Sequence, residues 1–378
     1  MKTPETSRLF SRWRNPSNGV ESLILTERAA PVQSPFYFTN RGFTDDGRFL
    51  WLACADPAKD PRPGAGVLAV VDFEQDRLRV FPGARFWGNP AVDLRSGEIY
   101  WLDGMELWKR GSGADDKPVR VNRVPEEIAR GRQPERIASH LTFSADGASV
   151  NIDARFDGET TIGDLPLDGS PLRVWQRIPG FYDHGQFSPT DPDLQMFAHE
   201  FWKDHEAEPF DGLRPYHRLW LIRRGGQAEP ILPEPVSHSG HEWWDPDGKH
   251  IWFVHYGVAV KKVNLQTRKE ESLWAGHLAH AYSDRTGRYL VSDMMPHPHH
   301  PTCHVAFRDT RTGAEVEIVN APPMPPTAVR WGHTHPHPQF CCSDRYVGYV
   351  TTVHGRIDLA LVPTADLIER ARNATVRT

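Results

Sequence analysis

At 378 residues the chain could form two average domains or one large all-β domain, so length alone leaves the domain count open. Its hydrophobic content of 39% and charged content of 25% are ordinary for a globular protein. A net charge of -5 and an isoelectric point near 6.4 give no indication of a nucleic-acid or membrane partner.

Two further features of the sequence bear on its compartment. No run of 18 apolar residues is present, and the N-terminal residues 1–16 lack the apolar core of a secretory signal. Of the four cysteines, Cys341 and Cys342 are adjacent, whereas Cys54 and Cys303 are isolated. This spacing is typical of reduced thiols, and we therefore expect a cytoplasmic protein.

A pattern recurs along the chain: an aromatic or apolar residue, a short polar turn that usually ends in glycine, and an apolar strand. It is clear in "FTDDGRFLWLAC" from Phe43 and degenerate in "FCCSDRYVGYVTT" from Phe340. Glycine accepts the positive φ that tight hairpin turns require, so each copy predicts a hairpin. The seven copies begin, in chain order, at Phe43, Val92, Phe143, Phe187, Trp244, Ser283 and Phe340.

A period of about fifty residues fits the four-stranded blade of a β-propeller. The sequence therefore predicts an all-β protein, a single seven-bladed β-propeller domain over residues 1–378, with residues 1–15 and 366–378 peripheral. The one credible helix is "TADLIERARNA" near the C-terminus. Two stacked β-sandwiches are the alternative, but they leave the even spacing unexplained.

Histidines recur at one position of this repeat. Five of the seven copies carry histidine three residues before the residue that starts the copy, namely His140, His184, His241, His280 and His337. The first copy has Asn40 there, and the second, counted back from its turn glycine, has Pro90. The strand before such a turn is commonly the innermost of a propeller blade. We therefore expect these side chains to meet near one mouth of the central channel, joined by His238, His277, His333 and His335 just upstream of the column.

The segment "WGHTHPHPQF" places His333, His335 and His337 on one face of an extended strand, because side chains alternate along it. Imidazoles that converge on a polar pocket can ligate a metal ion or move protons. For a single histidine, a hydrogen-bonded core role would be the better interpretation. Five in register, together with a His-x-His pair, favour a functional site.

Other residues have two readings each. His140 and His184 could bind substrate oxygens or simply form hydrogen bonds within the mouth. His199, followed by Glu200, could line a cleft or merely end a strand. For Trp202, Trp243 and Trp244, core packing is favoured over stacking on sugar rings. A second histidine-rich segment, "MMPHPHHPTCH", with His297, His299, His300 and His304, is a competing metal motif, which we read as a loop near the rim.

Several motifs resemble the oligogalacturonate lyases, which are seven-bladed β-propeller polysaccharide lyases of pectin degradation. They are "HEWWDPDGKHIWFVHY", "FSPTDPDLQMFAHE", "RLWLI" and above all "HPHPQF". The stretches "NPSNGVESLILT" and "FYFTNRGFTDDGRFL" resemble the opening segment of that family. The similarity runs from about residue 15 to residue 360 and is weak in the second blade and in the linkers.

The resemblance implies a divalent ion, typically manganese, held by histidines at one end of the channel. His280, His335 and His337 match the three histidine ligands. His241 matches the Brønsted base, and Arg218 matches the arginine beside it. The family has a glutamine where this chain has Gly332, so His333 or water would complete the site.

The implied chemistry agrees with what these residue types can do. β-Elimination removes the C5 proton of a uronate, next to a carboxylate that resists further negative charge. A metal ion on that carboxylate acts as a Lewis acid, and a neutral histidine suits the role of base. A nearby arginine would bind the anionic substrate and disfavour the protonated imidazole. Three imidazoles suit Mn²⁺ or a similar ion, and Zn²⁺ and Fe²⁺ accept the same ligands.

Three hypotheses follow. The first is a metal-dependent lyase that acts on a small acidic oligosaccharide, a short oligogalacturonide or related uronate oligomer. The second is a non-catalytic propeller that serves as a binding or scaffold module, with a structural histidine cluster. The third is a metal-dependent hydrolase or isomerase of another uronate. Linkage, chain length, the metal and the oligomeric state are left open by the sequence.

Overall fold

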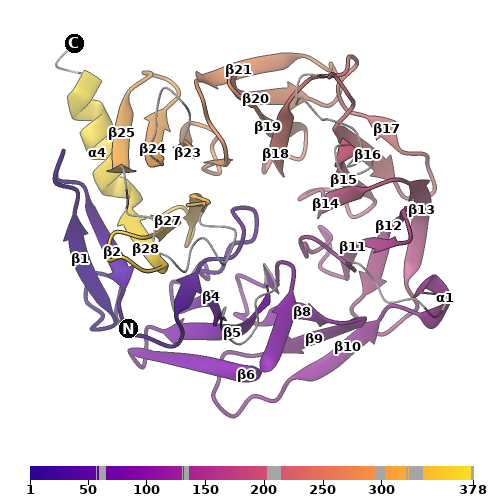
Figure 1. Cartoon of the computed structure of the whole chain (residues 1–378), viewed down its shortest axis with the longest axis horizontal. Helices are drawn as coiled ribbons and strands as arrows, with labels where there is room; N and C mark the ends of the chain where they lie inside the picture. The colour runs from indigo at the N-terminus through magenta and orange to yellow at the C-terminus, as the bar shows by residue number, and fades with distance from the viewer. Residues whose placement is uncertain are drawn as a thin grey trace.

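Seven β-sheets are arranged as blades around a common axis in the computed structural model of the chain (Figure 1). The structure describes residues 1–56, 58, 65–129, 131, 136–201, 214–294, 303–320, 322 and 335–375. The predicted seven-bladed β-propeller is confirmed, and the alternative of two stacked sandwiches is wrong.

Six of the sheets follow one another in chain order, and sequence neighbours within each sheet pair antiparallel. Their strands are, sheet by sheet, β3 (Val32–Ser34), β4 (Phe49–Ala55), β5 (Ala65–Asp72) and β6 (Arg77–Trp87); β7 (Ala91–Val92), β8 (Ile99–Asp103), β9 (Glu106–Arg110) and β10 (Val119–Arg123); β11 (Ser149–Phe156), β12 (Glu159–Pro166) and β13 (Arg173–Pro179); β14 (Tyr182–Phe187), β15 (Leu194–His199), β16 (Leu219–Arg223) and β17 (Glu229–Pro230); β18 (Ser239–Trp244), β19 (His250–His255), β20 (Ala259–Asn264) and β21 (Glu270–Ala275); β22 (Ala281–Ser283), β23 (Tyr289–Met294), β24 (His304–Asp309) and β25 (Glu315–Asn320).

The seventh sheet joins the two ends of the chain. Its order is β1 (Phe10–Arg14), β2 (Glu21–Leu25), β28 (Asp358–Pro363), β27 (Tyr346–Thr351) and β26 (Gln339–Cys341). β2 pairs antiparallel with β28, so the N-terminal strands close the ring by completing the last blade. β1 is the outermost strand of this blade.

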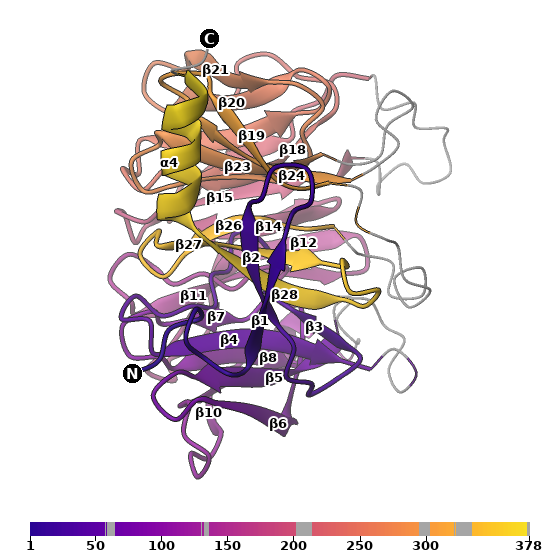
Figure 2. The same ribbon diagram turned by 90° about the vertical axis from the view of Figure 1, so that its left-hand side faces the viewer.

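Two helices lie outside the blades within the residues that the structure describes. α1 (Glu126–Ala129) is a single turn, and α4 (Thr364–Thr375) packs beside the last two blades (Figure 2). Leu367 and Ala371 of α4 are buried in the same hydrophobic cluster as residues of those blades. In the described part of the chain, no helix is long and apolar enough to cross a membrane.

The repeated polar turn has the same geometry in successive blades. The amide N–H of its glycine donates to a carbonyl oxygen three or four residues earlier, as Gly147 does to Ser144 at 2.8 Å between N and O. Each such glycine has a positive φ, which few other residues adopt without strain. They are Gly47, Gly97, Gly147, Gly248 and Gly287. The turn links the innermost strand to the next, and so sets the residues before it at one level in each blade.

Aromatic side chains fill the space between blades. The rings of Trp243 and Trp252 stack 5.5 Å apart, and both side chains are buried. Trp244 is buried in the neighbouring cluster. The favoured reading of Trp243 and Trp244 as core residues is therefore confirmed, and Trp202 lies outside the described residues. The four cysteines are free thiols.

Candidate metal and acid-base site at the centre of the propeller

The five aligned histidines come together around one residue that the sequence did not single out, Tyr37. Tyr37 follows β3, and its ring lies in the middle of the group. The ring-centroid distances from Tyr37 are 4.4 Å to His140, 4.9 Å to His337, 5.8 Å to His184, 6.0 Å to His280 and 6.5 Å to His241. Residues almost 200 positions apart in sequence thus face one shared centre, because each ends up at the inner edge of its blade.

Three of these histidines have a backbone conformation that L residues rarely adopt. The φ angle is 55° at His184, 51° at His241 and 46° at His337. His184 and His241 each lie in a β-bulge, where the register of the inner strand shifts against its neighbour. A bulge re-aims a side chain, and strained backbone of this kind concentrates at functional sites.

His280, His335 and His337 form a candidate metal-binding group. One nitrogen from each side chain lies within 4.8 Å of the other two. Nε2 of His280 is 3.0 Å from Nε2 of His337. Two nitrogen ligands that each lie about 2.1 Å from the same ion can have this separation. His280 and His337 are buried, and His335 is half-buried.

Asp293, at the end of the neighbouring strand β23, fixes the orientation of this group. Its Oδ2 lies 3.0 Å from Nδ1 of His280, and its two oxygens also accept the backbone N–H groups of His280 (2.8 Å) and His337 (3.1 Å). An ionised carboxylate only accepts, so Nδ1 of His280 donates and Nε2 keeps its lone pair. Carboxylates hold metal-ligating histidines in this way.

The donor set fits a divalent transition-metal ion, because three neutral imidazoles are ligands that Mn²⁺, Fe²⁺ and Zn²⁺ all accept. The position of the family's glutamine, Gly332, and its possible replacement His333 lie outside the described residues. So do His297, His299 and His300 of the competing histidine-rich segment. His304 of that segment is on β24, where its Nδ1 lies 3.3 Å from Oε2 of Glu317.

His241 lies directly beside this group, with its ring centroid 3.8 Å from that of His280. Its Nδ1 is 2.8 Å from the carbonyl oxygen of Ala279 and 2.8 Å from the hydroxyl of Tyr256. Because the carbonyl can only accept, Nδ1 carries the proton and Nε2 presents a lone pair. Burial lowers the pKa of His241 to about 3, and the charges of His184 and Arg218 act in the same direction. The imidazole is therefore neutral.

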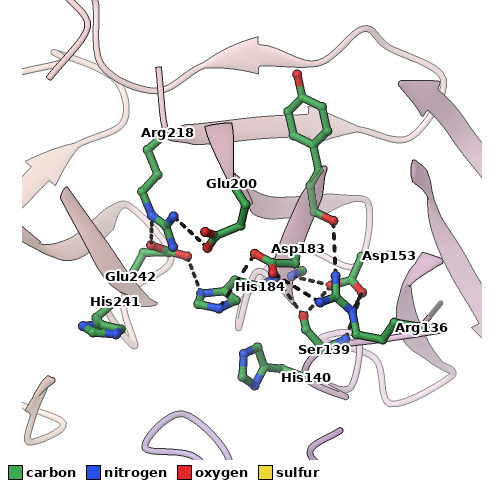
Figure 3. Close-up of polar contacts among 12 residues, drawn as sticks. Arg136, Ser139, His140, Asp153, Asp183, His184, Glu200, Arg218, His241 and Glu242 are labelled. Carbon is green, nitrogen blue, oxygen red and sulfur yellow. Dashed lines mark hydrogen bonds and ion pairs between the residues drawn. The ribbon is translucent and has the colours of Figure 1, made fainter. Parts of the chain in front are cut away.

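Arg218, immediately before β16, is buried between two carboxylates. Its Nη1 donates to Oε1 of Glu200 at 2.8 Å, and its Nε donates to Oε2 of Glu242 at 3.3 Å (Figure 3). Only 6% of the side chain is exposed. The sequence places Arg218 near the predicted base, and its charge does depress the pKa of His241. Its ion pairs are with Glu200, which the sequence placed at a possible cleft wall, and with Glu242, which the sequence did not single out.

Glu242 connects this arginine to a third histidine. Its Oε1 lies 2.9 Å from Nδ1 of His184, and Asp183 Oδ1 lies 3.8 Å from Nε2 of the same ring. Figure 3 shows Glu242 between Arg218 and His184. Burial alone would lower the pKa of His184, but the two carboxylates outweigh it and raise this pKa above its usual value. Burial would raise the pKa of Glu242, but the charge of Arg218, followed by the charge and hydrogen bond of His184, lowers it to about 2.

The remaining two candidates differ in position. His140 stacks on Tyr37 at the centre, its Nδ1 lies 3.1 Å from Nδ2 of Asn89, and burial lowers its pKa well below the usual value. His199, at the end of β15, stacks instead on Tyr182, with ring centroids 4.5 Å apart. The structure thus brings His140 into the central group and places His199 one strand further out.

Residues of the site that the sequence did not single out include Tyr37, Asp183, Glu242, Tyr256 and Asp293. Glu242 directly follows His241 in "HEWW", and Asp293 lies opposite His280 in the hairpin that the repeat predicts, so both carried a usable signal. Tyr37 had none, because its place depends on how the first blade meets the other six.

No family profile and no curated protein matches the chain by sequence. Solved structures do match. One is an oligogalacturonate lyase in complex with manganese, with a TM-score of 0.73 and 17% identity over 96% of this chain and 98% of that one. Another is the oligogalacturonate lyase of Vibrio parahaemolyticus, with a TM-score of 0.71 and 16% identity over 94% and 96%. The chain therefore has the propeller fold of these oligogalacturonate lyases.

Proposed function

We propose that the protein is a metal-dependent lyase that cleaves short oligogalacturonides by β-elimination, as a cytoplasmic enzyme of pectin breakdown. The observation that carries this proposal is the contact between His241, a neutral histidine with a lone pair on Nε2, and the three-histidine group that begins with His280. β-Elimination from a uronate needs both features at adjacent atoms of the substrate. The likeness in fold to two oligogalacturonate lyases supports the same reading.

We assign the metal to His280, His335 and His337. A divalent ion, which we propose to be Mn²⁺, would neutralise the uronate carboxylate and so make the adjacent C5–H bond more acidic. The protein's own contribution is orientation. Asp293 holds the His280 ring through Nδ1, and the backbone N–H of His337 binds the same carboxylate. These contacts set the His280 and His337 rings against each other, with their Nε2 atoms 3.0 Å apart.

His241 is the proposed base. Its Nε2 takes the C5 proton, while the carbonyl of Ala279 holds Nδ1–H and keeps the ring in one tautomer. Tyr256 lies against the same nitrogen from the neighbouring strand. The low pKa of this histidine ensures that the base is unprotonated throughout the neutral range.

Arg218 is proposed to act through Glu242 and not by contact with the substrate. Its two ion pairs and its burial leave the guanidinium enclosed by Glu200 and Glu242. His140 and His184, whose rings both face Tyr37, are the proposed contacts to substrate oxygens. His199 could contribute only at the outer end of a longer oligomer.

The products of trigalacturonate distinguish this function from its alternatives. Mass spectrometry after incubation with Mn²⁺ should find fragments whose masses add up to that of the substrate, one of them unsaturated. Fragments heavier by one water in total would indicate a hydrolase, and an unchanged mass with altered chromatography an isomerase. If trigalacturonate is unaltered, the hypothesis of a non-catalytic binding module remains. His241→Gln should abolish the fragments while Mn²⁺ binding persists.

A further inference from the structure

We infer that His184 is the acid that protonates the departing oxygen at C4 when the uronate chain is broken. This inference rests on the proposed elimination and adds a second catalytic residue to it. His241 accounts for the proton that leaves C5, but nothing assigned so far supplies the proton that the leaving oxygen needs. An alkoxide is a poor leaving group in water-poor surroundings, so a donor at this position matters.

The carboxylates around the ring of His184 favour its cationic form. Nδ1 faces Oε1 of Glu242 at 2.9 Å, and Nε2 faces Oδ1 of Asp183 at 3.8 Å. Both ring nitrogens therefore look toward carboxylates, and carboxylates only accept. The Nδ1–H bond is short and fixed. The Nε2–H lies too far from Asp183 for a hydrogen bond, so it remains available to donate to a substrate oxygen, and 17% of the side chain is exposed.

The charges around His184 come from every element packed against it. Within its own blade these groups are Asp183 on the same strand, Glu200 after β15 and Arg218 before β16. The next blade contributes His241 and Glu242 on β18. The preceding blades contribute Arg136, Asp153, His140 and Tyr37. Four carboxylates thus surround two arginines. One additional positive charge, on His184, reduces this imbalance, in agreement with the raised pKa of its imidazole.

His184 and His241 are matched in place and opposed in charge. Both occupy the same position of their blades, both lie in a β-bulge with φ near 50°, at 55° and 51°, and both face the ring of Tyr37. One has a carbonyl partner on Nδ1 and is neutral, whereas the other has a carboxylate partner on Nδ1. Environments that drive two titratable groups apart in this way mark the base and the acid of a reaction.

The step balances without any further reactant. The C5–H bond breaks and its proton goes to Nε2 of His241, while the electron pair forms the C4=C5 double bond. The C4–O4 bond breaks, and O4 takes the proton from Nε2 of His184. His241 ends as the cation and His184 as the neutral ring. Exchange of one proton with water at each ring restores both.

A second metal ion is the competing reading of the same residues. Asp183, His184 and Glu200 each offer a ligand atom within 4.8 Å of the others. Two guanidinium groups stand against it, because Arg136 lies 3.2 Å from Oδ2 of Asp183 and Arg218 lies 2.8 Å from Oε1 of Glu200. A divalent cation there would face both positive charges, whereas an imidazolium is already neutralised by Glu242.

The test compares two substrates that differ in their need for an acid. One is digalacturonate. The other is a galacturonate derivative whose C4 oxygen carries a nitrophenyl group, so that nitrophenolate leaves without protonation. His184→Gln should lower kcat on digalacturonate by roughly 100-fold or more, and change nitrophenolate release less than about threefold. Equal losses on both substrates, or no loss on either, would overturn the assignment.

Three controls separate the possible failures. His241→Gln should lose both substrates, because the base serves both. His250→Gln should leave kcat on both substrates unchanged. The His250 ring pairs with Asp247 at the surface (2.7 Å from Nδ1 to Oδ2), away from the central histidines. If the wild-type protein eliminates neither substrate, the proposed lyase function is wrong, and so is the role of His184 as its acid. If the wild-type protein is active on both substrates, the results for His184→Gln test the role of His184 alone.

A second variant tests the charge directly. Wild-type kcat on digalacturonate should fall at alkaline pH as His184 loses its proton, and the nitrophenyl substrate should show no such fall. Glu242→Gln should move that alkaline limb to lower pH by about one unit, because a carboxylate that favours the cation becomes a neutral amide. An unmoved limb contradicts the proposal. So would a count of bound Mn²⁺ that drops by one ion in His184→Gln, since that result assigns the residue to a metal.

Discussion

The rings of His241 and His280 lie 3.8 Å apart, centroid to centroid, although the two residues belong to adjacent blades. His241 is on β18 and His280 directly precedes β22, so the contact forms only when both inner strands stand at the same level. This contact brings the proposed base, His241, against the three histidines that we assign to the metal. Substrate held by that group would present the atom next to its carboxylate to Nε2 of His241.

The carboxylate of Asp293 should tune metal affinity. Asp293→Asn should weaken Mn²⁺ binding by roughly 10- to 100-fold, because the amide no longer fixes the lone pair of His280 toward the ion. Calorimetric titration with Mn²⁺ measures this. Asp309→Asn is a matched control in the same blade, where the buried carboxylate pairs with Arg288. It should keep the affinity of the wild type, and an Asp293→Asn protein that does so as well would remove the orienting role.

Replacement of Arg218 should separate positioning from substrate binding. A lysine cannot reach Glu200 and Glu242 together, so Arg218→Lys should lower the free energy of unfolding by about 3 kcal/mol and kcat by more than it raises KM. Denaturant titration and steady-state kinetics measure the two effects. Arg223→Lys, in an exposed pair with Asp191, should cost less than about 1 kcal/mol. A change confined to KM would instead place Arg218 on the substrate.

Glu242 should contribute stability that depends on pH. Its pKa is about 2 in the folded protein and 4.5 in its usual state, so the contribution is complete above pH 4.5 and is lost as pH falls toward 2. The shift corresponds to about 3 kcal/mol. Glu242→Gln should therefore be less stable than the wild type near pH 6, and the difference should narrow at about pH 3. Urea unfolding at the two pH values checks the sign, and a gap that widens in acid would be inconsistent with an ionised Glu242.

The repeat made the fold predictable from sequence. Each Asp-Gly or Ser-Gly turn marks the join between the first two strands of a blade, and the glycine conformations agree with that placement, as at Gly147 and Gly248. Alignment on those turns also identified the histidine column, since the turn fixes how far each inner strand extends. The pairing of β2 with β28 closes the ring that brings the column together, and the repeat did not predict that pairing.

The partners of the histidines were harder to foresee. Glu242 and Asp183 are each adjacent in sequence to a column histidine, yet the direction of their side chains depends on bulges at His184 and His241 that alternation cannot predict. Arg218 was placed from the resemblance, but its enclosure by Glu200 and Glu242 is a product of packing across two blades. The sequence pattern predicted which histidines meet at the centre, whereas the protonation state of each depends on partners that the tertiary structure supplies.

Ultraviolet absorbance tests the central proposal most directly, because an unsaturated uronate absorbs where galacturonides do not. Purified protein should be mixed with di- and trigalacturonate in the presence of Mn²⁺ or of EDTA, alongside His241→Ala. The account predicts a rise in absorbance with Mn²⁺ that EDTA abolishes and that His241→Ala lacks. A wild-type protein that binds Mn²⁺ yet gives no rise with either oligomer would contradict it.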